Sequence, residues 1–189
     1  MQPQMPTSIS ATEMPAYFSV SGTLLTVMVP PNFVPGSFAQ IYVTTSAGSS
    51  NTVWARVNET TPGVFAQAEN GLGVANALQI DKSIVSQSNP AVIGQTIYLD
   101  TTGLGAVLSS PGVGGIFGAP TYIPMYTITA TIGGVSAVVS YPKLSPLTTG
   151  LYQIAVTVPA GVSPGNAVPL VISGPDATSA QTTIAIAAP

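Results

Sequence analysis

The chain has 189 residues, of which three are Lys or Arg and six are Asp or Glu, so 5% of the side chains are charged, where about a quarter is usual. Phosphate binding needs clustered Lys and Arg, so this composition argues against a nucleic-acid partner and against a polybasic membrane anchor. The sequence has neither Cys nor His, which excludes disulfides, thiolate metal sites and the usual base of a nucleophilic triad. With few charges, copies of the protein repel one another only weakly. This is typical of a protein that packs against copies of itself or carries glycans.

The first ten residues, MQPQMPTSIS, lack the basic region and the apolar core of a signal peptide. No run of about 18 apolar residues occurs, so we expect no membrane insertion.

The 18 prolines and 19 glycines are spread along the whole chain and leave almost no window for a three-turn helix, so we expect an all-β protein. Between them lie short runs rich in Val, Ile, Thr, Tyr and Phe, with an alternation of apolar and polar residues that is clearest from Tyr152 to Val158. One segment, residues 73–80, is a candidate for a short helix, although its pattern is too brief to decide. In chain order, the predicted strands are residues 17–20, 24–29, 38–44, 52–57, 96–100, 126–132, 136–141, 152–158, 167–172 and 181–187.

One motif occurs twice. Residues 27–44 align without a gap with residues 156–173, at an offset of 129 residues. Each copy contains a Pro–Gly pair that fits positions i+1 and i+2 of a type II turn, where Pro presets φ and Gly accepts a positive φ. We therefore expect each copy to form a strand–turn–strand corner. The identical positions are Val27, Val29, Pro30, Pro35 and Gly36, which match Val156, Val158, Pro159, Pro164 and Gly165.

The match continues upstream at an offset of 121, where Ala16 and Ser19 match Ala137 and Ser140. On this alignment residues 5–11 correspond to the predicted strand 126–132, which is followed by a Gly133–Gly134 hairpin turn. The second copy is preceded by a further apolar strand within residues 89–105, whereas the first copy begins at Met1. We therefore predict two tandem immunoglobulin-like β-sandwiches, residues 1–62 and residues 63–189, the first lacking one or more strands.

Four stretches carry a family resemblance: TPGVFA (61–66), NPAVIGQTIYLDTTGLGAV (89–107), IGGVSAVVSY (132–141) and GLYQIAVTVPAGVSPGNAVPLVIS (150–173). Together they resemble the Solibacter-type C-terminal β-rich domain of large secreted proteins of Acidobacteria. The resemblance covers the chain from about Thr7 onward, and its most specific parts are TTGLG and GLYQIAVTVPAGV with the following SPG. It implies an immunoglobulin-like, extracellular, non-catalytic module with no established activity to transfer.

The acidic residues are isolated in the sequence and never fall at the one- or two-residue spacings of a calcium loop. We expect solvated loop residues rather than catalytic acids or metal ligands, and no cofactor. The two lysines, Lys82 and Lys143, leave a Ser–Lys arrangement formally open, but Lys82 lies in a polar loop context. The acidic residues are Glu13, Glu59, Glu69, Asp81, Asp100 and Asp176.

Three further features call for an interpretation. Residues 109–120 are rich in glycine but lack the Gly-Lys-Ser/Thr ending of a phosphate loop, so we expect a long loop with Ile116 and Phe117 as contact residues. For the single tryptophan, Trp54, a core or inter-domain anchor is favoured over a platform for sugar stacking. Asn58 begins the N-glycosylation sequon Asn58-Glu59-Thr60 and is the candidate for a covalent glycan.

These observations predict a non-catalytic extracellular structural protein. Its copies would assemble into a cell-surface or extracellular filament by β-strand complementation, with the apolar stretches at the two ends, MPTSISA and TTIAIAAP, as sources of a strand. The alternative is an adhesion or carbohydrate-binding module at the C-terminal end of a larger secreted protein. We expect no enzymatic activity.

Overall fold

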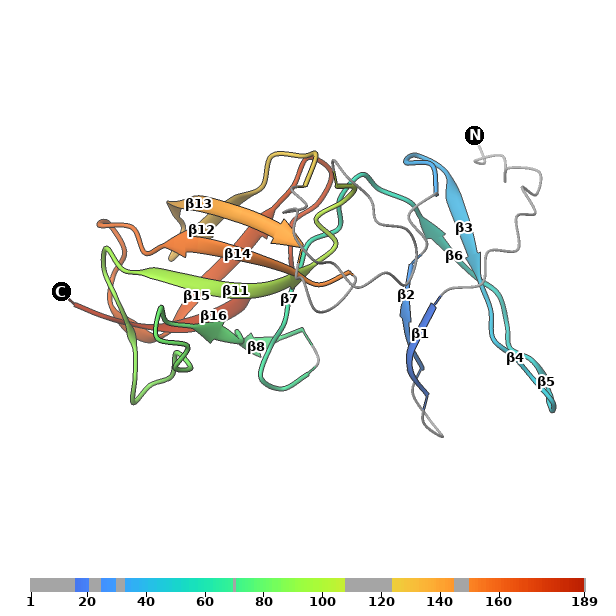
Figure 1. Cartoon of the computed structure of the whole chain (residues 1–189), viewed down its shortest axis with the longest axis horizontal. Helices are drawn as coiled ribbons and strands as arrows, with labels where there is room; N and C mark the ends of the chain where they lie inside the picture. Colours follow the sequence, from blue (N-terminus) through green and yellow to red (C-terminus); the bar gives the residue numbers. More distant parts are fainter. Residues whose placement is uncertain are drawn as a thin grey trace. The chain divides into compact units, whose positions relative to one another are not determined.

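The structure, a computed structural model, describes residues 16–20, 25–29, 33–69, 71–107, 124–144 and 150–188. It divides the chain into two compact units, Met1–Asn58 and Glu59–Pro189. The residues that it describes form strands and turns without a helix, so the all-β prediction is confirmed (Figure 1). The predicted division after residue 62 lies inside the second unit.

The second unit contains one large sheet. Its strands are hydrogen-bonded in the order β10-β16-β15-β12-β13-β14-β11-β7, with β8 pairing β16 and β9 pairing β11. In Figure 1 β11 and β14 cross the viewed side of this unit, and β15 and β16 run behind them. The strands are β7 (Gly63–Val64), β8 (Gly73–Val74), β9 (Ala77–Leu78), β10 (Ala91–Val92), β11 (Thr96–Thr102), β12 (Thr129–Ile132), β13 (Val135–Leu144), β14 (Tyr152–Thr157), β15 (Gly165–Ser173) and β16 (Thr182–Ala187).

Alternating side chains of these strands form one apolar core. Positions of equal parity in β11, β14, β15 and β16 are buried, as the period-2 pattern of the sequence predicts. The core includes side chains from strands at both ends of the strand order, since it contains residues of β11 and β14 as well as residues of β15 and β16. Its large, fully buried side chains include Ile97, Leu99, Ile132, Ile154, Leu170, Ile172 and Ile184.

The hairpin predicted at Gly133–Gly134 is confirmed. These residues join β12 to β13, whose adjacent ends pair Ile132 with Val135. Their φ angles are 59° and 78°, and two positive values are what a two-residue hairpin turn of type I′ requires.

The candidate short helix over residues 73–80 does not form. The segment instead forms β8 and β9, which pair with β16 and β11. Gly73 has a φ of 81°, outside the helical region, and Ala75 donates its N–H to the carbonyl of Thr183 at 2.8 Å. Ala75 and Ala77 are buried while Asn76 and Leu78 are half-buried, so the burial pattern has the period of a strand.

The described residues of the first unit form three separate strand pairs. In antiparallel pairs, β1 joins β2, β3 joins β6, and β4 joins β5. Its strands are β1 (Ala16–Val20), β2 (Leu25–Met28), β3 (Phe38–Ile41), β4 (Thr44–Thr45), β5 (Gly48–Ser49) and β6 (Val53–Arg56).

The sequence repeat is also a repeat of strand pairing, and it extends further than the sequence identities. When residue i of the first unit is matched with residue i + 129, the pairing of β3 with β6 reproduces that of β15 with β16 at three successive positions. The two units therefore share one register over a region that the sequence comparison did not include. The matched pairs are Ala39↔Ala55 with Val168↔Ile184, Gln40↔Trp54 with Pro169↔Thr183, and Ile41↔Val53 with Leu170↔Thr182.

The connection between these strands repeats in detail. The bridge Thr44↔Ser49 matches the bridge Ser173↔Thr178 at the same offset. A serine side chain also has the same role in both copies: Ser50 Oγ accepts from the Val43 N–H at 2.9 Å, and Ser179 Oγ accepts from the Ile172 N–H at 3.0 Å.

The upstream match at an offset of 121 agrees with the strand pairing at Ser19 but is one residue out of register at Ala16. Ala16 pairs with Met28, whereas Thr157, the counterpart of Met28, pairs with Val138 rather than with Ala137. Ser19 pairs with Thr26 in the first unit, and their counterparts, Ser140 and Ala155, pair in the second. Residues 5–11, predicted to correspond to β12, lie outside the described residues.

The predicted type II turn is confirmed in the first copy and wrong in the second. Gly36 has a φ of 85°, and Ser37 donates its N–H to the Val34 carbonyl at 3.2 Å, which closes a turn around Pro35–Gly36. In the second copy Gly165 already belongs to β15, where it pairs with Ile186. The turn lies earlier there, at residues 160–161, because β15 begins earlier relative to the motif than β3 does.

Candidate functional site

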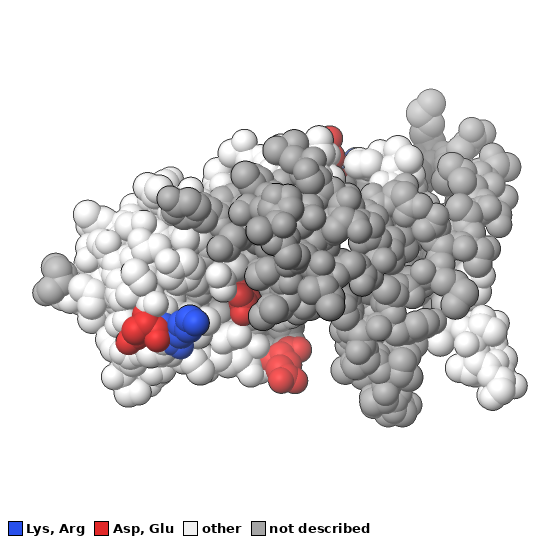
Figure 2. All heavy atoms as spheres, in the orientation of Figure 1, with Lys and Arg blue, Asp and Glu red and all other residues white. Residues whose placement is uncertain are grey.

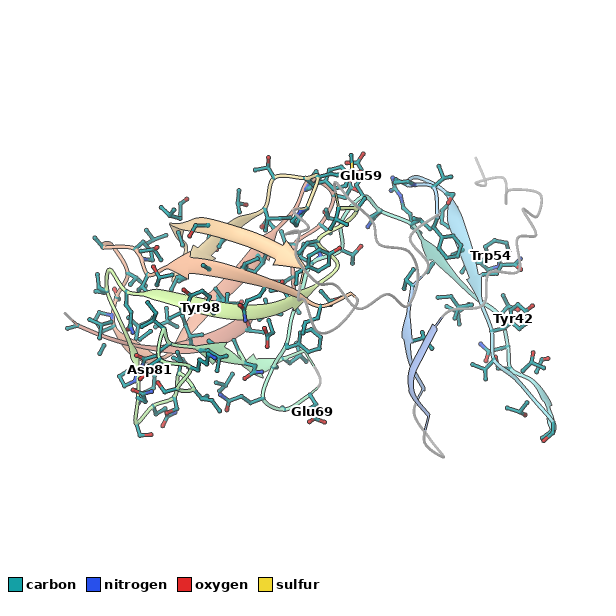
Figure 3. All side chains as sticks on the ribbon, in the orientation of Figure 1. Tyr42, Trp54, Glu59, Glu69, Asp81 and Tyr98 are labelled. Atoms are coloured by element: carbon teal, nitrogen blue, oxygen red, sulfur yellow. The ribbon has the colours of Figure 1, made fainter. Side chains whose placement is uncertain are left out.

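Glu59, Glu69 and Asp81 lie at separate places on the second unit, and Asp176 lies beside Glu59. Figure 2 shows separate acidic patches on the viewed face, and Figure 3 labels Glu59, Glu69 and Asp81 at three different places. The part of the chain that the structure describes has no group of three or more acidic residues able to hold a metal ion. Glu13 lies outside that part.

Three of these acids have local structural contacts. Asp81 Oδ1 accepts from the backbone N–H of Ser83 at 2.9 Å and from its hydroxyl at 2.6 Å, and these hydrogen bonds lower the pKa of Asp81 below its ordinary value. Asp100 accepts from the side-chain amide of Gln153, and Asp176 accepts from the backbone N–H of Glu59.

The formal Ser–Lys pair does not form a hydrogen bond at Lys82. The hydroxyl of Ser83 donates to Asp81 and accepts from the side-chain amide of Asn89 at 3.0 Å. Lys82 has a φ of 67°, so it occupies the tight turn that places Asp81 over Ser83. The side chain of Lys143 lies outside the described part.

The sequon has its third residue inside the fold. Thr60 is 1% exposed, and its Oγ1 has no hydrogen-bond partner among the described residues. Asn58 and Glu59 are half-buried. The chain enters the second unit here, since the next residue, Thr61, donates its N–H to the Gly103 carbonyl at 2.8 Å.

The two most specific motifs of the family resemblance meet in space. The hydroxyl of Tyr152, from GLYQIAVTV, donates to the carbonyl of Gly105, the last residue of TTGLG. The motif needs its glycines: Gly103 and Gly105 have φ angles of 70° and 88°, and a Cβ on Gly103 would overlap the carbonyl oxygen of Thr61. Both motifs therefore stabilise the second unit.

Polar side chains of the stretch NPAVIGQT (89–96) take part in a hydrogen-bond network. Gln79 Nε2 donates to Asn89 Oδ1 at 3.0 Å, and Gln95 Nε2 donates to Gln79 Oε1 at 2.7 Å. Gln95 Oε1 accepts from the Val92 N–H at 2.9 Å. These residues hold the loop between β9 and β11, so their role is also structural.

The C-terminal stretch TTIAIAAP is part of the second unit. Its first six residues form β16, which pairs with β15, β8 and β10, and Ile184 and Ile186 are 1% and 3% exposed. Such a strand is not available to another copy. The N-terminal stretch MPTSISA and the glycine-rich segment 109–120, with Ile116 and Phe117, lie outside the described residues.

The candidate functional surface lies on the first unit, where the two copies of the repeat differ in burial. Apolar residues in or just after β2, β3 and β6 are exposed where their counterparts at i + 129 are buried in the second unit. We call these first-unit residues the acceptor surface. They are Val27 (40% exposed), Val29 (71%), Ile41 (54%), Val43 (41%) and Val53 (53%), against Val156, Val158, Leu170, Ile172 and Thr182 at 0–1%.

The difference in exposure follows from the neighbouring strands. β14 pairs with β13 on one side and with β11 on the other, whereas its counterpart β2, within the described residues, pairs with β1 alone. Ile97 and Leu99 of β11 are fully buried in the core of the second unit. Within its described residues the first unit thus presents an edge of β2 without a second partner strand, and apolar side chains whose counterparts are buried in the second unit.

Trp54 is not in a core within the described structure. It is 42% exposed on β6, directly opposite Gln40 of β3, and Figure 3 shows it on the same side of these strands as Tyr42. Period-2 alternation predicts this shared face from the sequence once β3 and β6 are paired. The sequence repeat of residues 27–44 ends before β6, so it does not indicate this face.

The described part of the chain contains no helix that could span a membrane. Comparisons of the chain with models of protein families, with curated proteins and with solved structures returned no match.

Proposed function

We propose that this protein is a non-catalytic structural protein of two immunoglobulin-like sandwiches whose copies join at the first unit by β-strand complementation. In this proposal the assembly is a filament outside the cell or on its surface. The single observation that carries it is the acceptor surface, where apolar side chains are 40–71% exposed at positions that the second unit buries.

The second unit serves as a template for the complementing strand. β11 runs antiparallel to β14 and places Ile97 opposite Val156 and Leu99 opposite Ile154. At an offset of 129, a donor strand would run antiparallel to β2, with one apolar residue opposite Val27 and the next but one opposite Leu25.

Two physical terms favour such a contact. The donor would supply hydrogen-bond partners to the exposed edge of β2. It would also bury side chains of the acceptor surface, and completing the burial of a half-exposed Val or Ile contributes about 1 kcal/mol. A donor and an acceptor on different surfaces give a head-to-tail contact, which does not close and therefore propagates into a fibre.

Sedimentation velocity and negative-stain electron microscopy of the purified full chain test the proposal. A charged residue on an exposed sheet edge blocks strand addition, so Val29→Lys should prevent assembly. Val138→Lys is the matched control, because Val138 is 68% exposed on β13 of the second unit and Val29 is 71% exposed. Wild-type protein and Val138→Lys should form long assemblies, and Val29→Lys should remain monomeric.

A synthetic peptide with the sequence of residues 95–102 gives an independent test. It carries the β11 pattern and should occupy the edge of β2 in excess, which would shorten the assemblies, whereas a peptide of scrambled sequence should not. Monomeric wild-type protein at all concentrations, or equal assembly of Val29→Lys and Val138→Lys, would refute the proposal.

A further inference from the structure

The face of β3 and β6 that carries Trp54 has a composition that the fold does not require. Phe38 pairs with Arg56 and Gln40 pairs with Trp54, so these four side chains lie on one face of the strand pair, and Tyr42 continues the alternation. Ile41, Val43 and Val53 of the acceptor surface have the opposite parity. We call Phe38, Gln40, Tyr42, Trp54 and Arg56 the aromatic face.

The corresponding positions of the second unit, at i + 129, have different residues. Small or aliphatic residues replace each member of the aromatic face, although the pairing register is the same from Ala39 to Ile41. The aromatic rings are therefore not needed to build this strand pair. The counterparts are Ala167, Pro169, Val171, Thr183 and Ala185.

The three rings form a row. Trp54 is opposite Gln40, so it lies diagonally between Phe38 and Tyr42, and diagonal neighbours on one sheet face are within reach of aromatic side chains. Successive side chains on the same face are about 6.7 Å apart along a strand, so the row extends over about 13 Å. The rings are accessible: Phe38 is 51%, Tyr42 50% and Trp54 42% exposed.

The polar members of this face are also accessible. Gln40 and Arg56 are exposed, and neither side chain has a hydrogen-bond or ion-pair partner among the described residues. Arg56 is the one charged residue in the described part of the first unit, so this face has a positive charge without a neighbouring carboxylate there. A guanidinium group favours a carboxylate, which it can bind through two parallel hydrogen bonds.

These features narrow the ligand chemistry. A row of flat rings suits ligands with flat apolar faces, such as sugar rings or nucleobases. Nucleic acid is disfavoured because the whole chain has three cations and a net charge of −3. A sugar polymer with carboxylates offers both flat ring faces for the aromatic row and an anion for Arg56.

We propose that the aromatic face binds an acidic polysaccharide strand, with sugar rings stacked on Phe38, Trp54 and Tyr42 and a sugar carboxylate paired with Arg56. This site is distinct from the acceptor surface, whose residues have the opposite parity on β3 and β6. Binding to it does not depend on filament assembly.

The test uses the full chain with polygalacturonate as the acidic probe and hydroxyethylcellulose as the neutral one. Affinity electrophoresis gives the binding strength, and the emission of Trp54, the single tryptophan, should change on binding because the ring lies in the site. Polygalacturonate should retard the protein more strongly than hydroxyethylcellulose does.

Substitutions taken from the second copy keep strand-compatible residues at each position. Trp54→Thr should weaken polygalacturonate binding about tenfold, and Phe38→Ala and Tyr42→Val should weaken it to a smaller extent. Arg56→Ala should remove the preference for the acidic polymer. Phe65→Ala is the matched control, because Phe65 is an aromatic residue of the second unit with 46% exposure, and it should bind like the wild type.

Three results would overturn the proposal: wild-type protein that does not bind polygalacturonate, binding that Trp54→Thr leaves unchanged, or equal binding of both polymers with no effect of Arg56→Ala. Val29→Lys separates the two proposals, since it should lose assembly and keep polysaccharide binding.

Discussion

Tyr152 connects the two motifs TTGLG and GLYQIAVTV, and replacing it by Phe tests that connection. The side chain is 8% exposed and its hydroxyl donates to the Gly105 carbonyl. Phe keeps the ring packing and removes one hydrogen bond, so the Gly105 oxygen loses this donor. The free energy of unfolding of the second unit should fall by about 1–2 kcal/mol at neutral pH.

The same residue makes a prediction about alkaline pH. Burial raises the pKa of Tyr152 from its ordinary value of 10.0 to about 12. The folded protein thus holds the phenolic proton more tightly than the unfolded chain does. The resulting stability is full below pH 10 and is lost as the pH rises from 10 to 12, by about 2.7 kcal/mol at 1.36 kcal/mol per pKa unit.

Urea denaturation followed by far-ultraviolet circular dichroism at pH 8 and pH 11.5 measures both effects. Wild-type protein should lose stability between these conditions, and Tyr152→Phe should lose less. Tyr98→Phe is the control, because Tyr98 is half-buried on β11 and its hydroxyl has no hydrogen-bond partner among the described residues. The fluorescence of Trp54 provides a separate signal from the first unit. If Tyr152→Phe matched the wild type in stability and in pH dependence, the inferred burial and hydrogen bond would be wrong.

Two further substitutions test the packing where the chain enters the second unit. Gly103→Ala should lower the melting temperature strongly, because its Cβ would overlap the Thr61 carbonyl and the φ of 70° disfavours a side chain. Gly94→Ala is its control: the φ is 85° but nothing lies within 4 Å of the new Cβ, so only backbone strain of about 1 kcal/mol is expected, and equal losses for the two variants would contradict the clash. Thr60→Val should leave the free energy of unfolding unchanged or raise it by up to about 1 kcal/mol, and the melting temperature should not fall. The reason is that the buried hydroxyl has no hydrogen-bond partner among the described residues. A marked loss of stability in calorimetry would show that this hydroxyl has an important partner.

The strand positions of this protein follow closely from its local sequence pattern. Period-2 alternation located β11, β14, β15 and β16, and the residues there alternate between core and surface because side chains of a strand point to opposite faces. The Gly133–Gly134 turn was also predictable, because two consecutive positive φ angles nearly require glycine.

The prediction failed where a tertiary contact decided the local structure. The segment from Gly73 to Leu78 has an apolar pattern too short to distinguish a helix from a strand, and hydrogen bonds to β16 and β11 made it strands. The Pro164–Gly165 pair has the residues of a type II turn, but the pairing of Gly165 with Ile186 extends β15 through it.

The candidate site depended on the tertiary structure more than the fold did. From the sequence alone, Trp54 is an isolated aromatic residue in a predicted strand, which favours a core or inter-domain anchor. Its partners on the aromatic face lie on another strand, and only the pairing of β3 with β6 brings Phe38 beside Arg56. Residues of one face that are distant in sequence are assembled by register, which local patterns do not specify.

Local sequence patterns are enough to predict that this chain is rich in β-strands, poor in charged residues and built from two related copies of one motif. These properties follow from composition, from the frequency of Pro and Gly, and from side-chain alternation, all of which act locally. Tertiary strand pairing gives the two copies a shared register at Ala39↔Ala55, Gln40↔Trp54, Ile41↔Val53 and Thr44↔Ser49, and it makes one copy bury positions that the other exposes. Burial depends on which strands lie beside an edge, and that is a property of the whole fold rather than of any segment.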